Sequence, residues 1–180
     1  KEEDLIQNLY VLSSHVQILC FTTKGKVFWL KVYEIPVASR ISKGRPLVNM
    51  LNLDDDESVS EILPVEEFSE DKFIFMATKK GTTKKTNLSL FAKKYKSGIK
   101  AINLDDDDVL IGTAITSGDN EILLASSSGK LIRFSESHVR PMGRTARGVR
   151  GITLKKGEKL ISLMVGDETK TILCVSENGY

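Results

Sequence analysis

Short apolar runs alternate with polar, glycine-centred turns along this chain, and the pattern repeats. Four glycines mark the repeat at spacings of 56, 48 and 50 residues: Gly25, Gly81, Gly129 and Gly179. An apolar triplet begins seven residues before each glycine, and a threonine or serine stands three residues before it. A period near 50 residues is typical of repeat proteins, in which each unit buries its apolar face against the next. The chain is therefore predicted to be an array of small, similar units.

The register continues beyond the first glycine of each unit. A second glycine opens a short strand-like run, in the order 46–48, 99–102 and 149–152. A polar turn then precedes a last apolar run, in the order 59–65, 109–115 and 159–165. Each unit thus holds about four short strands, and helical periodicity is weak. The predicted fold class is all-β, with propeller-like stacking of four-stranded repeats.

The whole chain, residues 1–180, is interpreted as one domain with approximate repeats at 17–65, 72–115 and 121–165. Residues 4–12 match the last strand of a unit, and residues 170–180 match a first strand with its turn. We therefore expect three complete blades, flanked by strands that belong to adjoining blades. A closed ring normally has more blades than three, so a piece of a larger disc is expected.

Composition favours a globular protein. Of the 180 residues, 41% are hydrophobic and 28% are charged. No apolar run approaches the roughly 18 residues of a membrane helix, and the polar N-terminal sequence shows no secretory signal. Cys20 and Cys174 share a column of the repeat with Met76 and Leu124, which predicts small core hydrophobes rather than a disulfide. A reduced, cytoplasmic protein is expected.

The repeat columns contain no catalytic constellation. His15 and His138 occupy positions without recurring chemistry, and the sequence has no P-loop, GxSxG motif or Cys/His pair. The acidic runs at 54–57 and 105–108 could be imagined as metal sites, but the third unit has KKGE there, which favours solvated turns. We predict no catalytic residue, no metal site and no cofactor in this chain.

A formal net charge of +2, from 26 basic and 24 acidic residues, hides a strong segregation of charge. Residues 79–104 hold eight lysines and no acid, and residues 130–156 hold eight basic residues and one acid, Glu136. Within each unit the basic residues come first and the acids later, so stacked units would present one positive rim and one negative rim. A positive rim favours the phosphate backbone of duplex nucleic acid, and the sparse aromatics disfavour stacking on single strands.

Three stretches resemble the C-terminal, DNA-wrapping domain of DNA gyrase A: GKVFWLKVYEIP at 25–36, KKGTTKKTN at 79–87 and VRPMGRTARGVRGI at 139–152. The similarity extends over essentially the whole chain. The resemblance implies a β-pinwheel, a propeller-like disc of about six blades. It also implies a non-catalytic module that wraps duplex DNA around a basic perimeter, within a type IIA topoisomerase that uses ATP to introduce negative supercoils.

The resemblance further implies the partners of such a module. ATP and Mg²⁺ are expected only elsewhere in the holoenzyme, an A2B2 assembly in the bacterial cytoplasm, associated with the nucleoid. The DNA contacts carried over to this sequence are basic residues expected on the perimeter: Lys26, Lys43, Arg45, Lys84, Lys85, Lys96, Lys130, Arg133, Arg147 and Arg150.

Other interpretations stay open on the sequence alone. The family's basic heptapeptide QRRGGKG is not in these 180 residues and would be expected just before Lys1, so the equivalent domain of topoisomerase IV is one alternative. A protein-binding propeller is a second alternative; WD repeats are shorter, at about 40–45 residues, whereas the kelch period fits better. A propeller enzyme would need recurring acids or histidines, which the repeat columns lack.

Overall fold

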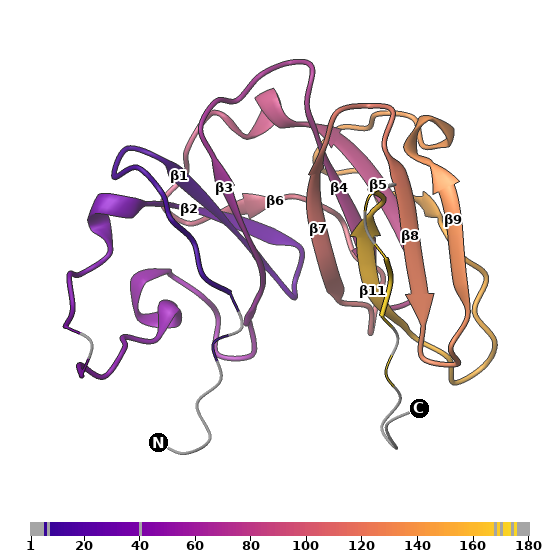
Figure 1. The fold of residues 1–180 in the computed structure, drawn as a ribbon, viewed down its shortest axis with the longest axis horizontal. Helices are drawn as coiled ribbons and strands as arrows, with labels where there is room; N and C mark the ends of the chain where they lie inside the picture. The colour runs from indigo at the N-terminus through magenta and orange to yellow at the C-terminus, as the bar shows by residue number, and fades with distance from the viewer. Residues whose placement is uncertain are drawn as a thin grey trace.

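Three antiparallel sheets stand side by side in an arc in this computed structural model (Figure 1). The structure describes residues 6, 8–39, 41–167, 169, 171–173 and 175. The described chain also forms four short 3-10 helices: η1 (Val32–Glu34), η2 (Leu47–Met50), η3 (Leu88–Phe91) and η4 (Glu136–His138). The predicted all-β class is confirmed, and the sheets are the blades of a propeller-like array.

Each sheet is built around the first hairpin of one repeat. The first sheet has the order β3 (Val59–Val65), β1 (Gln17–Thr22), β2 (Lys26–Lys31), β6 (Ile99–Lys100). The second has the order β7 (Leu110–Thr116), β4 (Phe73–Thr78), β5 (Thr82–Asn87), β10 (Val149–Arg150). The third has the order β11 (Leu160–Val165), β8 (Glu121–Ser126), β9 (Leu131–Ser135). The last apolar run of each repeat therefore forms a strand, as the sequence predicted.

The outer strand of a sheet comes from the next repeat along the chain. β6 belongs to the second repeat but pairs with β2, where Ile99 lies opposite Val27. β10 belongs to the third repeat but pairs with β5, where Val149 lies opposite Thr83. A sequence repeat is therefore not a blade, because each of the first two sheets is completed by a strand exchanged from the following unit.

Backbone hydrogen bonds at the hairpin turns fix this exchange. The carbonyl oxygen of Gly25 accepts hydrogen bonds from the N–H groups of Ala101 (2.8 Å) and Ile102 (3.2 Å). The carbonyl oxygen of Gly81 accepts the same pair of bonds from residues 151–152, at 2.9 and 3.2 Å. We call this pair of bonds the hairpin lock. It satisfies backbone groups that would otherwise be buried without partners where two repeats meet.

The glycines of the hairpin lock have two reasons to be glycine. Gly25 and Gly81 have φ values of +72° and +87°, in the left-handed region that L side chains rarely adopt. A Cβ at Gly81 would also lie 2.8 Å from Cγ2 of Ile152 and 2.9 Å from its carbonyl oxygen. Gly129 has a φ of +79°, but within the described chain no strand docks there and a Cβ would meet no atom within 4 Å. The glycine that marks each of the first two repeats is therefore also the place where the next repeat binds.

The apolar core lies largely between neighbouring repeats. Phe21 of the first repeat meets Phe91 of the second edge to face, with ring centroids 6.1 Å apart. Trp29 packs against this cluster and donates a hydrogen bond from Nε1 to the carbonyl oxygen of Phe91 at 2.8 Å. A second cluster joins Phe75 of the second repeat to Ile152 of the third. Burial of apolar surface stabilises a fold by about 25 cal/mol per Å². Each repeat is therefore stabilised by the apolar surface that it buries against the next.

The first repeat departs from the prediction at residues 46–48, which were expected to form a strand. They lead instead into the 3-10 helix η2. The strands at this position in the later repeats, β6 and β10, each pair with the hairpin of the preceding repeat. The described chain has no hairpin ahead of the first repeat, so this segment has no strand to pair with.

The flanking strands differ from the prediction in the residues that the structure describes. Residues 8–12 and 171–173 form no strand, and much of 4–12 and 170–180 lies outside the described residues, as do Cys174 and Gly179. Cys20 is buried, as expected for a core position, and burial raises the pKa of its thiol to about 12. This thiol is therefore protonated and unreactive at neutral pH.

The strand β5 is buried in spite of its sequence, TTKKTN. Lys84 and Lys85 expose only 0% and 3% of their surface. Both were predicted to face DNA on the perimeter, and burial contradicts this because a phosphate cannot reach either ammonium. Successive residues of a strand point to opposite faces, so the two side chains reach different junctions between repeats.

Lys84 fastens the loop before β10 to the junction of the first two sheets. Its Nζ donates hydrogen bonds to the carbonyl oxygens of Ala101, at 2.6 Å, and Arg144. Burial, with a smaller contribution from the charge of Arg144, lowers the pKa of the Lys84 ammonium to about 8. The side chain thus orders the loop from inside.

Lys85 fastens β5 to η4 of the next repeat. Its Nζ donates to the carbonyl oxygen of Glu136 at 3.0 Å and lies 3.7 Å from Oε2 of the same residue. The buried Glu136 carboxylate also accepts hydrogen bonds from the Thr116 hydroxyl (2.8 Å) and from the N–H groups of Gly118 and Asn120 (both 2.9 Å). A buried charge needs such partners, so this lysine is part of the structural framework.

We expect Gly81→Ala to destabilise the chain more than Gly129→Ala does. Both substitutions place alanine at a positive φ, at a cost of about 1–2 kcal/mol. Only the first adds overlap with Ile152, and such overpacking costs a further ~1–3 kcal/mol. Urea denaturation of the 180-residue chain measures the difference. Equal losses would show that docking of the third repeat does not depend on close approach at the hairpin lock.

The buried ammonium of Lys84 predicts a gain in stability at alkaline pH. Its pKa is about 8 in the folded chain, against an ordinary value of 10.5. Between these values the unfolded chain binds more protons, so the free energy of unfolding rises with pH, and the gain is lost as the pH falls through 8. Native chain should therefore gain stability relative to Lys84→Met between about pH 7 and about pH 10 in urea denaturation. A difference between the two proteins that is constant with pH would contradict this.

Candidate nucleic-acid interface

The exchanged strands carry basic residues on the outer side of the array. β7 packs against both β3 and β11, so these three strands form the inner side, and β6 and β10 lie at the opposite edges of their sheets. Each outer strand contributes one exposed basic residue, Lys100 and Arg150. Both stand two residues after the second glycine of their repeat. The strand exchange therefore places a cation at the outer edge of each of these sheets.

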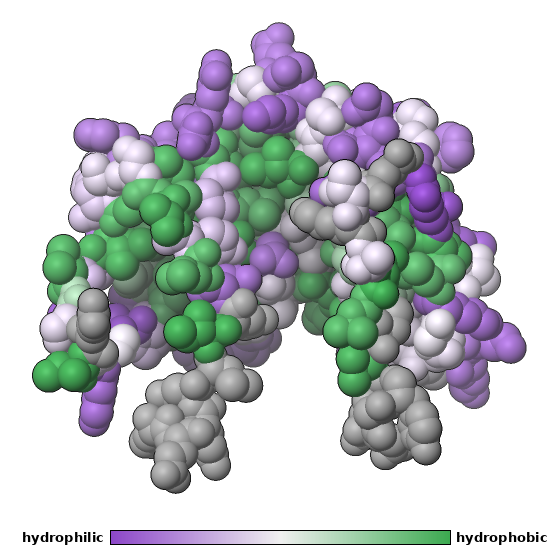
Figure 2. Space-filling view, viewed as in Figure 1, coloured by the Kyte–Doolittle hydropathy of each residue, from purple (hydrophilic) through white to green (hydrophobic). Residues whose placement is uncertain are grey.

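The loops that lead into the outer strands add further cations. Together with the strands and the corresponding loop of the first repeat, they provide the exposed basic residues that we call the perimeter set: Lys43, Arg45, Lys93, Lys94, Lys96, Lys100, Arg140, Arg147 and Arg150. Hydrophilic side chains follow the convex outline of the arc, and apolar residues gather on its inner side (Figure 2). The residues of the perimeter set are all exposed, so a large, charged partner can reach them.

Acids and bases are less separated in space than along the chain. In the first sheet the acidic turn folds back onto the hairpin, where Lys26 Nζ lies 2.9 Å from Asp54 Oδ2 and 3.3 Å from Glu57 Oε2, and Lys24 pairs with Asp56. The hydrogen bond between Lys26 and Asp54 raises the pKa of the lysine and lowers that of the aspartate. The expectation of separate positive and negative rims is therefore wrong at this hairpin, because its lysines already form ion pairs with carboxylates.

The third sheet has similar pairs. Lys130 Nζ lies 3.9 Å from Glu158 Oε1, and Arg133 Nε donates to Glu121 Oε2 at 2.8 Å. The pKa of Glu158 is lowered chiefly by a hydrogen bond from the backbone N–H of Lys155. Both cations are exposed, but a phosphate would have to displace or share these carboxylates.

The structure divides the ten predicted contacts into three groups. Five belong to the perimeter set: Lys43, Arg45, Lys96, Arg147 and Arg150. Three others are exposed or partly exposed and paired with carboxylates of their own repeat: Lys26, Lys130 and Arg133. Two are buried: Lys84 and Lys85. Sequence reasoning did not select Lys100, although its alignment with Arg150 was a sufficient signal.

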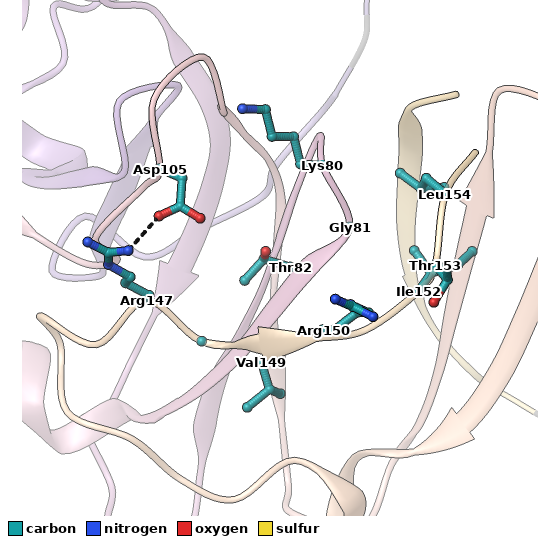
Figure 3. Close-up of a pocket in the computed structure, with 11 residues that line it drawn as sticks. Lys80, Gly81, Thr82, Asp105, Arg147, Val149, Arg150, Ile152, Thr153 and Leu154 are labelled. Atoms are coloured by element: carbon teal, nitrogen blue, oxygen red, sulfur yellow. Dashed lines mark ion pairs between the residues drawn. The ribbon is translucent and has the colours of Figure 1, made fainter. Parts of the chain in front are cut away.

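A cavity of about 500 Å³ opens where the second hairpin meets the outer strand of the third repeat (Figure 3). Its lining includes Lys80 and Thr82 of the hairpin, Arg147 and Arg150, and Asp105. Arg147 Nη1 lies 3.0 Å from Asp105 Oδ1, and the two side chains are 71% and 57% exposed. An ion pair this exposed contributes about 1 kcal/mol at most. The hairpin lock thus builds a polar cavity from two repeats.

Nothing in the described part of the chain resembles a metal site, because no three His, Cys, Asp or Glu side chains are grouped to hold an ion there. His15 and His138 are both exposed. Among the residues that the structure describes, no helix has the length and apolar character to cross a membrane.

Comparison with known proteins places this architecture in a family. The family model described as DNA gyrase C-terminal domain, beta-propeller, matches residues 17–66, 72–117 and 120–167. DNA gyrase A of Salmonella typhimurium (strain LT2) is 49% identical over 180 residues, which are 100% of this chain and 20% of that protein. The Escherichia coli (strain K12) protein is also 49% identical, over 100% of this chain and 21% of that protein. The chain therefore spans about a fifth of the length of these relatives.

Two solved structures share the fold. The C-terminal domain of DNA topoisomerase IV superposes with a TM-score of 0.78 at 30% identity, covering 86% of this chain and 48% of that one. A DNA gyrase A C-terminal domain superposes with a TM-score of 0.72 at 24% identity, covering 87% of this chain and 50% of that one. With the family model matched in all three repeats, the chain belongs to the DNA gyrase C-terminal domain family of β-propellers.

Proposed function

We propose that this chain is a non-catalytic DNA-binding module that bends duplex DNA along its basic perimeter. The observation that carries the proposal is the recurrence of an exposed cation at the same place on the exchanged outer strands, Lys100 and Arg150. The sheets that these strands complete stand side by side in an arc, so a duplex bound to both sheets would follow a curved path (Figure 1). A duplex that follows this path must curve with it.

The energetics of such binding are set by phosphates rather than bases. Each neutralised phosphate lowers the slope of log K against log salt by about 0.9, without regard to sequence. Smoothly bending 20–30 bp by 40–90° costs on the order of 1–6 kcal/mol. Several charge-neutralising contacts, spread over more than one blade, can together offset this cost. The array, rather than a single sheet, is therefore the binding unit that we propose.

We further propose that the module serves a DNA gyrase, a type IIA topoisomerase that introduces negative supercoils with ATP. The relatives that match at 49% identity are gyrase A proteins, and the chain matches only about a fifth of each. ATP and Mg²⁺ would act elsewhere in the A2B2 holoenzyme, and the remaining domains of that assembly would be the protein partners. The proposed location is the bacterial cytoplasm, where the DNA substrate of the nucleoid lies.

The equivalent domain of topoisomerase IV is the alternative whose expected DNA binding is most like that of a gyrase domain. Its C-terminal domain has the same fold and 30% identity to this chain, and both assignments predict a basic perimeter that binds duplex DNA. The higher identity to gyrase proteins favours gyrase. A protein-binding propeller is less well supported, because it does not require exposed cations at a repeating outer position.

The combined substitution of Lys100→Gln and Arg150→Gln is expected to weaken binding to plain duplex DNA. Loss of two phosphate contacts should flatten the slope of log K against log salt by about 1.8, since each contact accounts for about 0.9. Fluorescence anisotropy with a labelled duplex at several salt concentrations measures both quantities.

The matched control for this experiment is the combined substitution of Lys24→Gln and Lys130→Gln. It removes the same charge from lysines that lie beside carboxylates at the hairpins. The control is expected to change the salt slope less than the outer-strand variant does. Identical slopes for the two variants would argue against a specific perimeter, and an outer-strand variant that binds like the native chain would argue against the proposed function.

A further inference from the structure

The cavity between the second and third repeats has the composition of a phosphate site. Lys80, Arg147 and Arg150 line it with three cations, and Thr82 and Thr153 add hydroxyl donors. Arg147 and Asp105 face each other on one side, and Arg150 lies on the other side of Thr82 in this view (Figure 3). Guanidinium and hydroxyl groups are among the side chains that most often contact the DNA backbone.

The cavity exists only where the two repeats meet. Gly148 has a φ of +105°, and a Cβ there would lie 2.5 Å from the carbonyl oxygen of Thr83. The backbone before β10 can therefore press against β5 only with glycine at this position. This close approach places Arg147 and Arg150, which flank Gly148 along the chain, at the hairpin that carries Lys80. The cavity is thus lined by cations of two repeats: Lys80 of the second, and Arg147 and Arg150 of the third.

Asp105 has a different partner from its counterpart in the first repeat. Asp54, at the same position of the acidic turn, pairs with Lys26 of its own hairpin at 2.9 Å. The residue at the position of Lys26 in the second hairpin is Thr82, which has no charge. Asp105 pairs instead with Arg147 of the next repeat. The carboxylate therefore acts on a perimeter cation at this junction, rather than on a hairpin lysine.

We propose that this cavity holds one phosphodiester group of the duplex, and that Asp105 limits the affinity by competing with the phosphate for Arg147. The inference rests on the proposed DNA-binding function and adds a specific subsite to it. On binding, Arg147 exchanges the Asp105 carboxylate for a phosphate oxygen, and Arg150 with the two threonine hydroxyls provides the remaining contacts. Because the pair is exposed and weak, the exchange needs no rearrangement of the fold.

The test compares Asp105→Asn with Asp107→Asn in the 180-residue chain. Asp107 lies in the same turn, is exposed, and has a φ of 59° that asparagine also tolerates, so both variants change the net charge equally. Affinity for a labelled duplex of about 30 bp is measured by anisotropy at several salt concentrations. Removing an exposed competing ion pair predicts about two- to fivefold tighter binding for Asp105→Asn beyond the effect of Asp107→Asn.

Two further variants connect the effect to Arg147. Arg147→Gln should flatten the salt slope by about 0.9, as expected for one lost phosphate contact. The double variant with Asp105→Asn should bind like Arg147→Gln alone, because the carboxylate acts through the arginine. If the native chain binds duplex but Asp105→Asn and Asp107→Asn behave alike, the subsite is wrong and the DNA-binding function stands. If the native chain shows no salt-dependent binding to duplex, both proposals fail.

Discussion

The carbonyl oxygen of the hairpin glycine is the point on which the rest of this structure depends. It accepts two backbone N–H groups from the next repeat, and this bond pair delivers the outer strand of each of the first two sheets. The left-handed turn exposes the carbonyl, and the missing side chain lets the incoming isoleucine approach. This contact brings in the exchanged strand with Ile102 and Ile152 of the apolar clusters, and at the second hairpin it borders the cavity. Lys100 and Arg150 lie at the outer edges of their sheets because the lock holds the strands that carry them.

Much of the fold could be predicted from the sequence, because regularly spaced glycines and apolar triplets mark each repeat. The hairpins and last strands follow directly from that pattern. The exchange of β6 and β10 could not be predicted, because a period describes what each unit contains and not which sheet a strand will join. Residues 46–48 show the consequence: the same pattern gives a 3-10 helix where the described chain offers no neighbouring hairpin.

The candidate site was harder to predict, because charge alone does not reveal accessibility. Lys84 and Lys85 look like surface residues in TTKKTN, yet both donate hydrogen bonds to backbone carbonyls, and Lys85 also forms an ion pair with the buried Glu136 carboxylate. Acids and bases that lie far apart in sequence meet at the hairpins, since each polar turn folds back on its own sheet. What remains is a smaller set of cations on the outer strands and loops, whose role follows from topology rather than from composition.

Strand exchange also has a mechanical consequence. A bent duplex behaves like a stiff spring and pulls outward on whatever holds it. In this chain that pull would fall on β10, which is bonded to β5 of the preceding repeat while its own chain continues into β11 of the following one. Tension applied at the edge of one sheet is thereby shared with its neighbour through covalent and hydrogen bonds together. The recoil of curved DNA would strain the array as a whole, rather than peel away a single strand.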